Sequence, residues 1–283
     1  HNLIKEETVL VSVMYVNNEV GTIQPIKEIS NVIEKRNAES RMPKADFHTD
    51  AVQAIEYLNC DVQELGVDML SLSAHKFHGP KGIGALYIRE GTKITPLIHG
   101  GAQEYRKRAG TENVPYIVGL GKAVEVINKE LGKDKSRALG PVSKPGFGEL
   151  PNHVTGLFPS GSKVTKLRDK LIDGILDTIP TAELTGHPQK RAPHIASFVF
   201  PGVEGEAILL HLDRKGIAAS SGSACTSGEL KPSHVLLAME IPQEVAHASL
   251  RLSLSKYTTE EEIDYVLEKL PPIIEKLKAM SPL

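Results

Sequence analysis

One lysine, Lys76, follows an apolar run and stands beside two side chains that can bind an anion. Residues 69–72 read as a buried strand, and the strand ends in Ser73-Ala74-His75-Lys76 before glycines and a proline interrupt the chain. Burial at a strand end would lower the pKa of the lysine and make its amine nucleophilic toward an aldehyde. Ser73 and His75 could hold the anionic group of the same molecule. The alternative is a surface lysine on a turn.

A carboxylate at the end of an earlier short strand extends this chemistry. Residues 46–50 are strand-like and end in Asp50. An acid in that place could pair with the protonated ring nitrogen of pyridoxal phosphate (PLP), a cofactor whose aldehyde is bound by a lysine. Asp50 could equally be a helix N-cap, and the two roles are compatible. We therefore expect Asp50 and Lys76 to belong to one PLP site.

The polar loop at residues 17–21 follows another apolar run, residues 8–16. In open α/β sheets, ligands bind beyond the carboxyl ends of the strands, which is where this loop would lie. A plain turn is the alternative, because asparagine and glycine are turn residues. The basic residues Arg106 and Lys107 favour a solvated loop.

Cys225 lies among small residues only, in the stretch 221–228. A structural cysteine is normally buried among apolar groups, whereas a reactive one must be accessible, so this composition favours a nucleophile over an incidental loop cysteine. Cys60 is expected to pack. Two cysteines so far apart make neither a disulfide framework nor a zinc site, and a reducing, cytoplasmic setting is expected.

The elements that must position these residues follow from periodicity. Strands and helices alternate through the first half, which predicts an α/β fold with a mainly parallel sheet. The run 8–16 lacks alternation and indicates a strand buried on both faces. Strands are expected at 8–16, 46–50, 69–72 and 85–88, and helices at 25–36 and 115–131.

The second half predicts a smaller α+β domain. Arg251 is expected to face away from the leucines of its strand, and the last helix should begin with a capping box of Thr258 and Glu261 and break at Pro271-Pro272. Helices are expected at 163–179, 205–212 and 235–239, and strands at 195–200, 216–220 and 250–254.

Bulk properties exclude several classes. A net charge of -2 argues against nucleic-acid binding, and no run approaches the ~18 apolar residues of a membrane span. Residues 132–162 are rich in glycine and proline, with little periodicity, so we expect an irregular insertion or linker there. The chain has no initiator methionine and enters a strand almost at once, like the continuation of something longer.

Seven stretches in this order resemble the cysteine desulfurases, more narrowly the NifS/IscS class, which has the PLP-dependent class-V aminotransferase fold (fold type I). They are residues 17–21, 50–53, 73–76, 79–87, 108–113, 221–227 and 251–254, and the resemblance covers nearly the whole chain except 132–162. In that family roughly the first third of the polypeptide precedes Thr8. The resemblance therefore implies an incomplete large PLP-binding domain at 1–131, the linker 132–162, and a small C-terminal domain at 163–283 that carries Cys225.

The resemblance also implies a cofactor site. Lys76 would form the Schiff base with PLP and then act as an acid and base. Asp50 would pair with the pyridine nitrogen and Gln53 with the ring hydroxyl. Ser73 and His75 would bind the phosphate, and His75 also counts as a catalytic candidate. Thr111 would reach the phosphate in a partner subunit, which requires a homodimer.

Substrate and sulfur roles follow from the same resemblance. Asn18 would lie near substrate and cofactor, and Arg251 would bind the carboxylate of L-cysteine, which its forked donors suit. Cys225 would take the sulfur as a persulfide, leave L-alanine, and pass the sulfur to an iron–sulfur scaffold or another acceptor protein. Cys225 is also a candidate transient iron–sulfur ligand; no resident metal is expected.

Two alternatives remain open. One is a selenocysteine lyase or another class-V PLP enzyme, although the small-residue stretch around Cys225 favours transfer of sulfur to a protein. The other is a chain that retains the motifs but is inactive without the missing N-terminal segment, or that serves only as a binding module.

Overall fold

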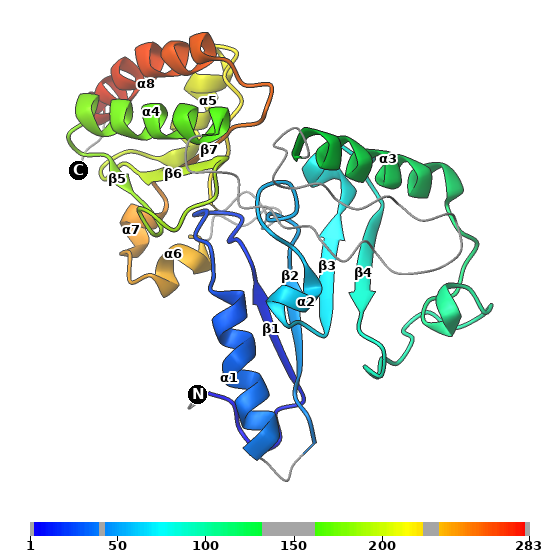
Figure 1. Cartoon of the computed structure of the whole chain (residues 1–283). Coiled ribbons are helices and arrows are strands. Elements are labelled where there is room, and N and C mark those ends of the chain that lie inside the picture. Colours follow the sequence, from blue (N-terminus) through cyan, green and yellow to red (C-terminus); the bar gives the residue numbers. More distant parts are fainter. Residues whose placement is uncertain (1–2, 40–42, 132–161, 223–231, 281–283) are drawn as a thin grey trace. The chain divides into compact units, whose positions relative to one another are not determined.

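The computed structural model describes residues 3–39, 43–131, 162–222 and 232–280 (Figure 1). These residues form two compact units. The first contains residues 3–16, 24–39 and 43–131, and the second contains Asn17–Ile23 and residues 162–222 and 232–280. The predicted linker 132–162 lies outside the described residues, apart from Ser162. Within the described ranges, no helix is long and apolar enough to cross a membrane.

The first unit is built on a four-stranded sheet in the order β1-β2-β3-β4. Its strands are β1 (Leu10–Met14), β2 (Asp46–Asp50), β3 (Met69–Ser73) and β4 (Gly84–Ile88). The pairs β1–β2 and β2–β3 are parallel, and β3–β4 is antiparallel. The predicted, mainly parallel α/β sheet is therefore confirmed.

The two faces of this sheet differ. In β2, Phe47 and Thr49 are buried, whereas His48 and Asp50 are partly exposed. On the Phe47 side lies α1 (Ile26–Glu39), and α3 (Val114–Leu131) packs against the turn after β3; the short α2 (Val62–Leu65) precedes β3. The expectation that the first strand is buried on both faces is wrong, because β1 is an edge strand of the described sheet and Leu10 is half exposed.

The second unit is an antiparallel sheet covered by helices. The sheet has the order β5-β6-β7, with β5 (Glu183–Leu184), β6 (Ile195–Val199) and β7 (Ser249–Ser253). Its helices are α4 (Lys163–Thr178), α5 (Gly205–Asp213), α6 (His234–Ala238), α7 (Gln243–Ala246) and α8 (Glu260–Met280). This arrangement confirms the predicted α+β character of the second half.

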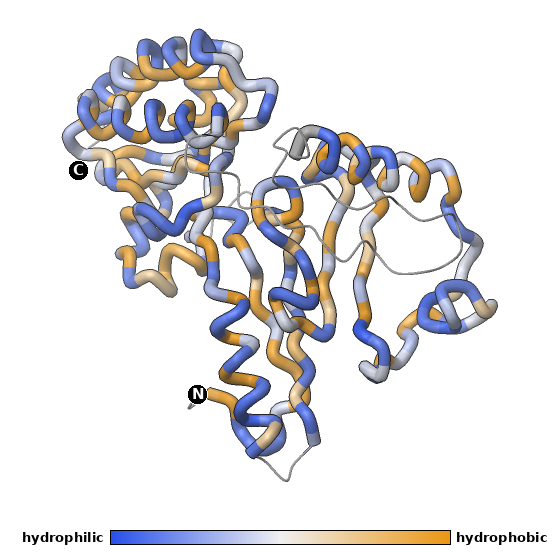
Figure 2. Tube along the Cα trace, viewed as in Figure 1, coloured by the Kyte–Doolittle hydropathy of each residue, from blue (hydrophilic) through white to orange (hydrophobic). Residues whose placement is uncertain are grey.

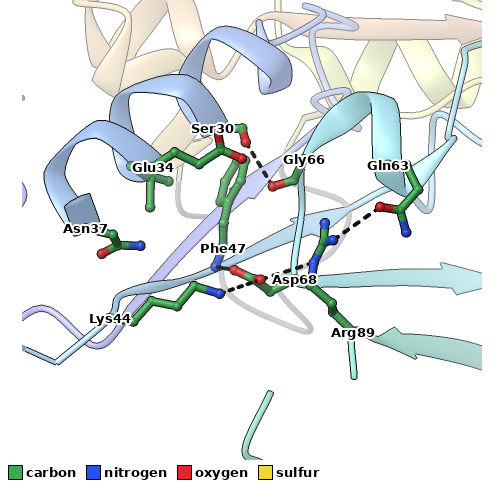
Figure 3. A pocket seen from close by; sticks show the side chains of 10 residues that line it. Ser30, Glu34, Asn37, Lys44, Phe47, Gln63, Gly66, Asp68 and Arg89 are labelled. Carbon is green, nitrogen blue, oxygen red and sulfur yellow. Dashed lines mark hydrogen bonds and ion pairs between the residues drawn. The ribbon is translucent and has the colours of Figure 1, made fainter. Parts of the chain in front are cut away.

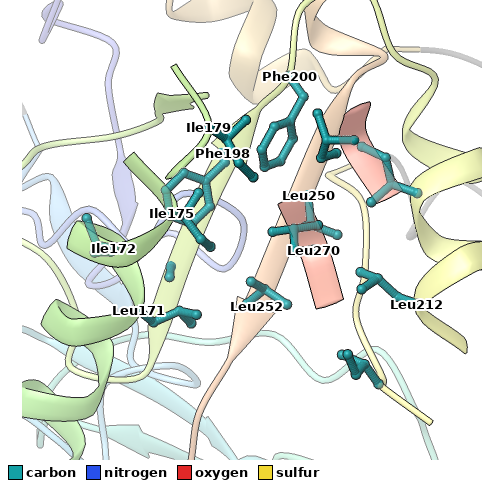
Figure 4. Packing of buried hydrophobic residues seen from close by; sticks show 14 of the residues in the cluster. Leu171, Ile172, Ile175, Ile179, Phe198, Phe200, Leu212, Leu250, Leu252 and Leu270 are labelled. Carbon is teal, nitrogen blue, oxygen red and sulfur yellow. The ribbon is translucent and has the colours of Figure 1, made fainter. Parts of the chain in front are cut away.

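The core of the second unit explains these elements. Every residue of β6 is buried, and Figure 4 shows Phe198 and Phe200 packed with Leu250 and with the apolar sides of α4 and α8. Polar and apolar residues alternate along α4 and α8 (Figure 2), as expected for helices with one buried side. The α4 helix begins at Ser162, whose Oγ accepts a hydrogen bond from the Thr165 backbone N–H.

Three local predictions are wrong in this unit. Of the predicted strand 216–220, only Ser220 forms a bridge, with Arg251. The capping box lies one position later, between Thr259 and Glu262. The last helix continues through its two prolines, because Ile273 and Ile274 beyond them are buried in the core and offset the lost hydrogen bonds.

Candidate active site

Asp50 and the turn after β3 lie at the same edge of the first unit's sheet. The strands β2 and β3 are parallel neighbours, and Asp50 of β2 pairs with Ser71 of β3, two residues before Ser73. Asp50 Oδ1 accepts a hydrogen bond of 2.9 Å from the Val52 N–H, so the aspartate closes a turn, and turns rather than a helix follow it. The carboxylate is thereby fixed at the carboxyl end of β2.

Lys76 lies in a single 3-10 turn, η1 (Ala74–Phe77), directly after β3. Ala74 and Phe77 are buried against Ala123 and Ile127 of α3, whereas Lys76 is exposed. The expectation that Lys76 is buried is therefore wrong, because the apolar residues on either side of it occupy the core. The result is an amine held on an anchored turn and directed to solvent.

The anion-binding candidates lie on the same turn. Ser73 Oγ and His75 Nδ1 are 2.9 Å apart, and both residues are accessible. The bond orients the imidazole at the strand end. Ser73, His75, Lys76 and Asp50 thus all lie at the carboxyl edge of β2 and β3.

Sequence reasoning missed His48, which stands two residues before Asp50 on the same face of β2. Its Nδ1 lies 2.8 Å from Ser12 Oγ on β1, and its Nε2 lies 3.2 Å from Ser71 Oγ on β3. Burial lowers the pKa of His48, and the nearby Asp50 carboxylate opposes that shift. The signal that could have found it is the strand period of two, which places residues 48 and 50 on one face.

The remaining predicted residues of the first unit lie in connecting segments. Gln53 is partly exposed in the turn after Asp50, and Thr111 is exposed just before α3. Arg106 and Lys107 are exposed, in agreement with a solvated basic loop.

In the second unit, Arg251 projects from β7 away from the buried Leu250 and Leu252, as predicted. Its Nη1 donates a hydrogen bond of 2.7 Å to the Asn18 carbonyl. Among the described residues, none accepts from its buried Nε. A guanidinium with an uncommitted buried donor suits a carboxylate.

The segment 17–23 is a tight turn held by Asn17. Its Oδ1 accepts hydrogen bonds of 2.9 Å from the N–H groups of Glu19 and Val20. The structure therefore shows the turn that sequence reasoning offered as the alternative, and the same turn presents the Asn18 carbonyl to Arg251. The segment 17–23 can therefore be a turn and still contribute to the site.

The two cysteines cannot be compared directly, because Cys225 lies outside the described residues. Cys60 is buried, as expected, and burial raises the pKa of its thiol to about 12. In the part of the chain that the structure covers, no cluster of histidine, cysteine and carboxylate side chains suits a metal ion.

A pocket of about 360 Å³ lies elsewhere in the first unit, beside α1 and the amino ends of β2 and β3 (Figure 3). At its base, Asp68 accepts hydrogen bonds from Lys44 Nζ at 2.7 Å and from the Phe47 N–H at 2.9 Å, and Arg89 Nε lies 3.3 Å away. Three of its charged lining groups, those of Lys44, Asp68 and Arg89, are thus paired with one another. The pocket includes none of the predicted site residues, and we assign it a structural role at the start of the strands.

Comparisons with known proteins agree on one family. The profile of the class-V aminotransferases ("Aminotransferase class-V") matches residues 1–140 and 155–266. The chain is 49% identical over 282 residues to "Cysteine desulfurase IscS" of Methanosarcina thermophila, covering 100% of this chain and 61% of that protein. It is 47% identical over 281 residues to "Cysteine desulfurase NifS" of Azotobacter vinelandii, covering 99% and 62%.

A solved structure described as a "NIFS-LIKE PROTEIN" superimposes with a TM-score of 0.77 at 37% identity. The match covers 98% of this chain and 64% of that one. The chain thus spans less than two thirds of the length of these relatives.

Proposed function

The chain belongs to the class-V aminotransferase family, and from this premise we propose that it binds PLP and carries the sulfur-transfer residues of a cysteine desulfurase. The observation that carries the proposal is the edge shared by Asp50 and the Ser73–Lys76 turn on neighbouring parallel strands. A carboxylate, a hydroxyl, an imidazole and an accessible amine are the donor set that PLP needs. The relatives named cysteine desulfurase support L-cysteine as the substrate.

The residues of the first unit would divide the work of holding PLP. When bound, PLP withdraws electrons from the substrate carbon that carries the amino group. The Lys76 amine would bond the cofactor aldehyde and then move the proton at the substrate Cα. Asp50 would hold the ring nitrogen, Gln53 the ring hydroxyl, and Ser73 and His75 the phosphate.

The residues of the second unit would bind substrate and take the sulfur. Arg251 would bind the substrate carboxylate, near Asn18. The Cys225 thiolate would attack the sulfur of L-cysteine, so that an S–S bond forms and the Cβ–S bond breaks. The carbon keeps that electron pair and takes up a proton, which gives L-alanine and a persulfide on Cys225.

We further propose a cytoplasmic homodimer that passes the sulfur to an iron–sulfur scaffold or another acceptor protein. Thr111 is exposed and carries a hydroxyl group, which suits a contact with the phosphate in a second copy. Two widely separated cysteines favour a reducing compartment. Residues 1–131 would form the large PLP domain and 163–283 the small one, with Cys225 also available as a transient iron–sulfur ligand.

The first experiment is a visible spectrum of the purified chain with added PLP, followed by addition of L-cysteine. We expect an absorbance band from PLP bound through an amine, a shift of that band with L-cysteine, and formation of alanine. Lys76→Ala should abolish the band, because Lys76 is the amine proposed to bond the cofactor aldehyde. Lys81, the other exposed lysine on this loop, has no predicted role. Lys81→Ala is the matched control and should keep the band.

Cys225→Ala separates cofactor binding from sulfur transfer. We expect this variant to retain the absorbance band and to lose sulfide release, whereas Cys60→Ala retains both. Turnover by Cys225→Ala would remove Cys225 from the reaction. Turnover of L-selenocysteine but not L-cysteine by the unmodified chain would select the lyase instead.

A further inference from the structure

We propose that Glu56 and His78 are a pair of positioning residues for Lys76, because they join the turn that carries Lys76 to the segment that follows Asp50. The proposal rests on the proposed function and adds two residues to which that function gives no part. Glu56 and His78 both belong to the first unit, and Glu56 is only 6% exposed.

The contact between the two side chains joins the chain segments that carry the proposed PLP ligands. His78 Nε2 lies 3.1 Å from Glu56 Oε1. His78 is two positions after Lys76, and Glu56 is three positions after Gln53. The hydrogen bond therefore links the turn of the proposed Schiff-base lysine with the segment expected to hold the pyridine ring.

The backbone of His78 has a conformation that favours glycine. His78 is the C-cap of η1, and its φ of +67° lies in the left-handed region. A side chain in this region is strained, and glycine is the usual residue at the end of a helical turn. The turn would form more easily with glycine, so the contacts of the imidazole must offset the strain.

Glu56 is a buried carboxylate with hydrogen-bond donors beside it. Burial and the Glu56 charge raise the pKa of Tyr57, whose hydroxyl keeps its proton and donates to Glu56. The backbone of this segment is fixed by turns, such as the bond of 3.0 Å from the Ile55 N–H to the Ala51 carbonyl. Burying a carboxyl group is costly, so an apolar residue would serve stability alone.

The other contacts of the lysine turn anchor it without fixing its direction. Its apolar residues pack against α3, and a Cβ added to Gly79 would lie 2.8 Å from Ala74 Cβ. Apolar contacts have no preferred direction, whereas a hydrogen bond needs a defined angle. The bond between Glu56 and His78 therefore orients the anchored turn, and with it the Lys76 amine.

Hydrogen exchange in the chain without PLP tests the pair directly. The N–H groups of His78 and Gly79 both donate to the Ala74 carbonyl, so their protection reports the closed turn. We expect Glu56→Ala to lower this protection about tenfold, the factor for one hydrogen bond to a charged group. Glu56→Gln keeps an oxygen that can accept from the imidazole, and should restore most of the protection.

A titration with PLP, followed by visible absorbance, tests the effect on Lys76. We expect Glu56→Ala to weaken PLP binding about tenfold, because a smaller fraction of the protein holds the amine in the competent direction. His78→Gly removes the same hydrogen bond but relieves the backbone strain. It should weaken PLP binding equally, whereas Glu56→Gln should bind PLP almost as the unmodified chain does.

Asp68→Ala is the matched control. It removes another buried carboxylate of the first unit, which accepts from the Phe47 N–H at the amino ends of the strands. It should leave the protection of His78 and Gly79 and the affinity for PLP unchanged. A general loss of stability would instead speed hydrogen exchange throughout the sheet.

Protection of Gly79 in His78→Gly equal to that in Asp68→Ala would overturn the proposal, even if Glu56→Ala fails to fold. Lower protection in Glu56→Ala, with no PLP band from any form of the chain, would support the orienting bond and reject the proposed function. Unchanged PLP affinity in Glu56→Ala, with alanine still formed, would reject the pair as positioning residues and retain that function.

Discussion

Cys60 shows how the surroundings of a thiol set its chemistry. The side chain is buried in the first unit, and burial raises the pKa of the thiol from its ordinary value near 9 to about 12. A thiol held protonated is a poor nucleophile and a poor metal ligand. Of the two cysteines, only Cys225 is therefore a candidate for sulfur chemistry.

This burial predicts a loss of stability in alkali. Because the folded-state pKa of Cys60 lies above the unfolded value, its contribution is complete below pH 9 and is lost between pH 9 and about 12. We expect the free energy of unfolding, measured with urea, to fall above pH 9 by up to about 1.4 kcal/mol per pH unit.

Cys60→Ala should flatten this dependence, while Cys225→Ala should leave it unchanged. Urea midpoints at pH 8.0 and 10.0 provide the measurement. An equal alkaline loss in the Cys60→Ala variant would mean that other groups cause it, such as the partly buried Tyr15 and the buried Tyr57, whose pKa values are also raised by burial.

For single residues, the sequence predicted positions on the strands better than the surroundings of each side chain. Asp50 and Arg251 lie where the strand pattern indicated, because alternation within a short strand is a local property. The exposure of Lys76 depends on Ala74 and Phe77 packing against a helix about fifty residues later in the sequence, which no local pattern contains. His48 was missed for the same reason, since its partners Ser12 and Ser71 lie on other strands.

Elements with strong periodicity were predicted to within a residue or two. The strand 46–50 and the helices α3 and α4 have nearly the predicted bounds. The continuation of α8 through Pro271 and Pro272 could not be predicted, because it depends on core packing beyond the prolines. The predicted strand at 216–220 is a single bridge, since pairing needs a neighbour and only Ser220 has one among the described residues.

The conformation and packing of the segment 17–23 depend on one glycine. Gly21 has φ +74°, and an added Cβ would lie 2.9 Å from Ile195 Cβ at the start of β6. Gly21→Ala should therefore destabilise the protein by about 2–4 kcal/mol, from backbone strain and from the clash. Denaturant unfolding measures the difference.

Gly202→Ala is the matched control for this substitution. Gly202 has φ +81° in the same unit, and an added Cβ there would meet nothing within 4 Å. We expect Gly202→Ala to lower the free energy of unfolding by about 1 kcal/mol, from backbone strain alone. Equal costs at the two positions would show that close approach to Ile195 does not matter.

On the scale of the whole molecule, each unit is assembled from separated parts of the chain. Val16 and Gln24 belong to the first unit, and the seven residues between them belong to the second. The Gly21 carbonyl accepts from the Ala192 N–H at 2.8 Å, and the Ile23 N–H donates to the Lys190 carbonyl at 2.9 Å. The second unit is complete only with this distant segment.

We therefore expect the fragment 162–283 to be less stable than the same fragment mixed with a peptide of residues 15–25. The peptide restores the hydrogen bonds to Arg191, Ser233 and Arg251. Melting temperature should rise with peptide concentration, since a ligand that binds only the folded state stabilises it by mass action.

A peptide carrying Glu19→Ala and Gly21→Ala is the control and should raise the melting temperature less. If the fragment alone melted at the temperature of the mixture, the segment would contribute nothing to the second unit.

The divided second unit also has a consequence during synthesis. Residues 17–23 are made more than two hundred residues before Ser233 and Arg251. At about 5–20 residues per second, that interval is roughly 10–50 s. Throughout it the nascent segment lacks these two side chains, so the hydrogen bonds of Glu19 with Ser233 and of the Asn18 carbonyl with Arg251 can form only after the intervening chain has been made.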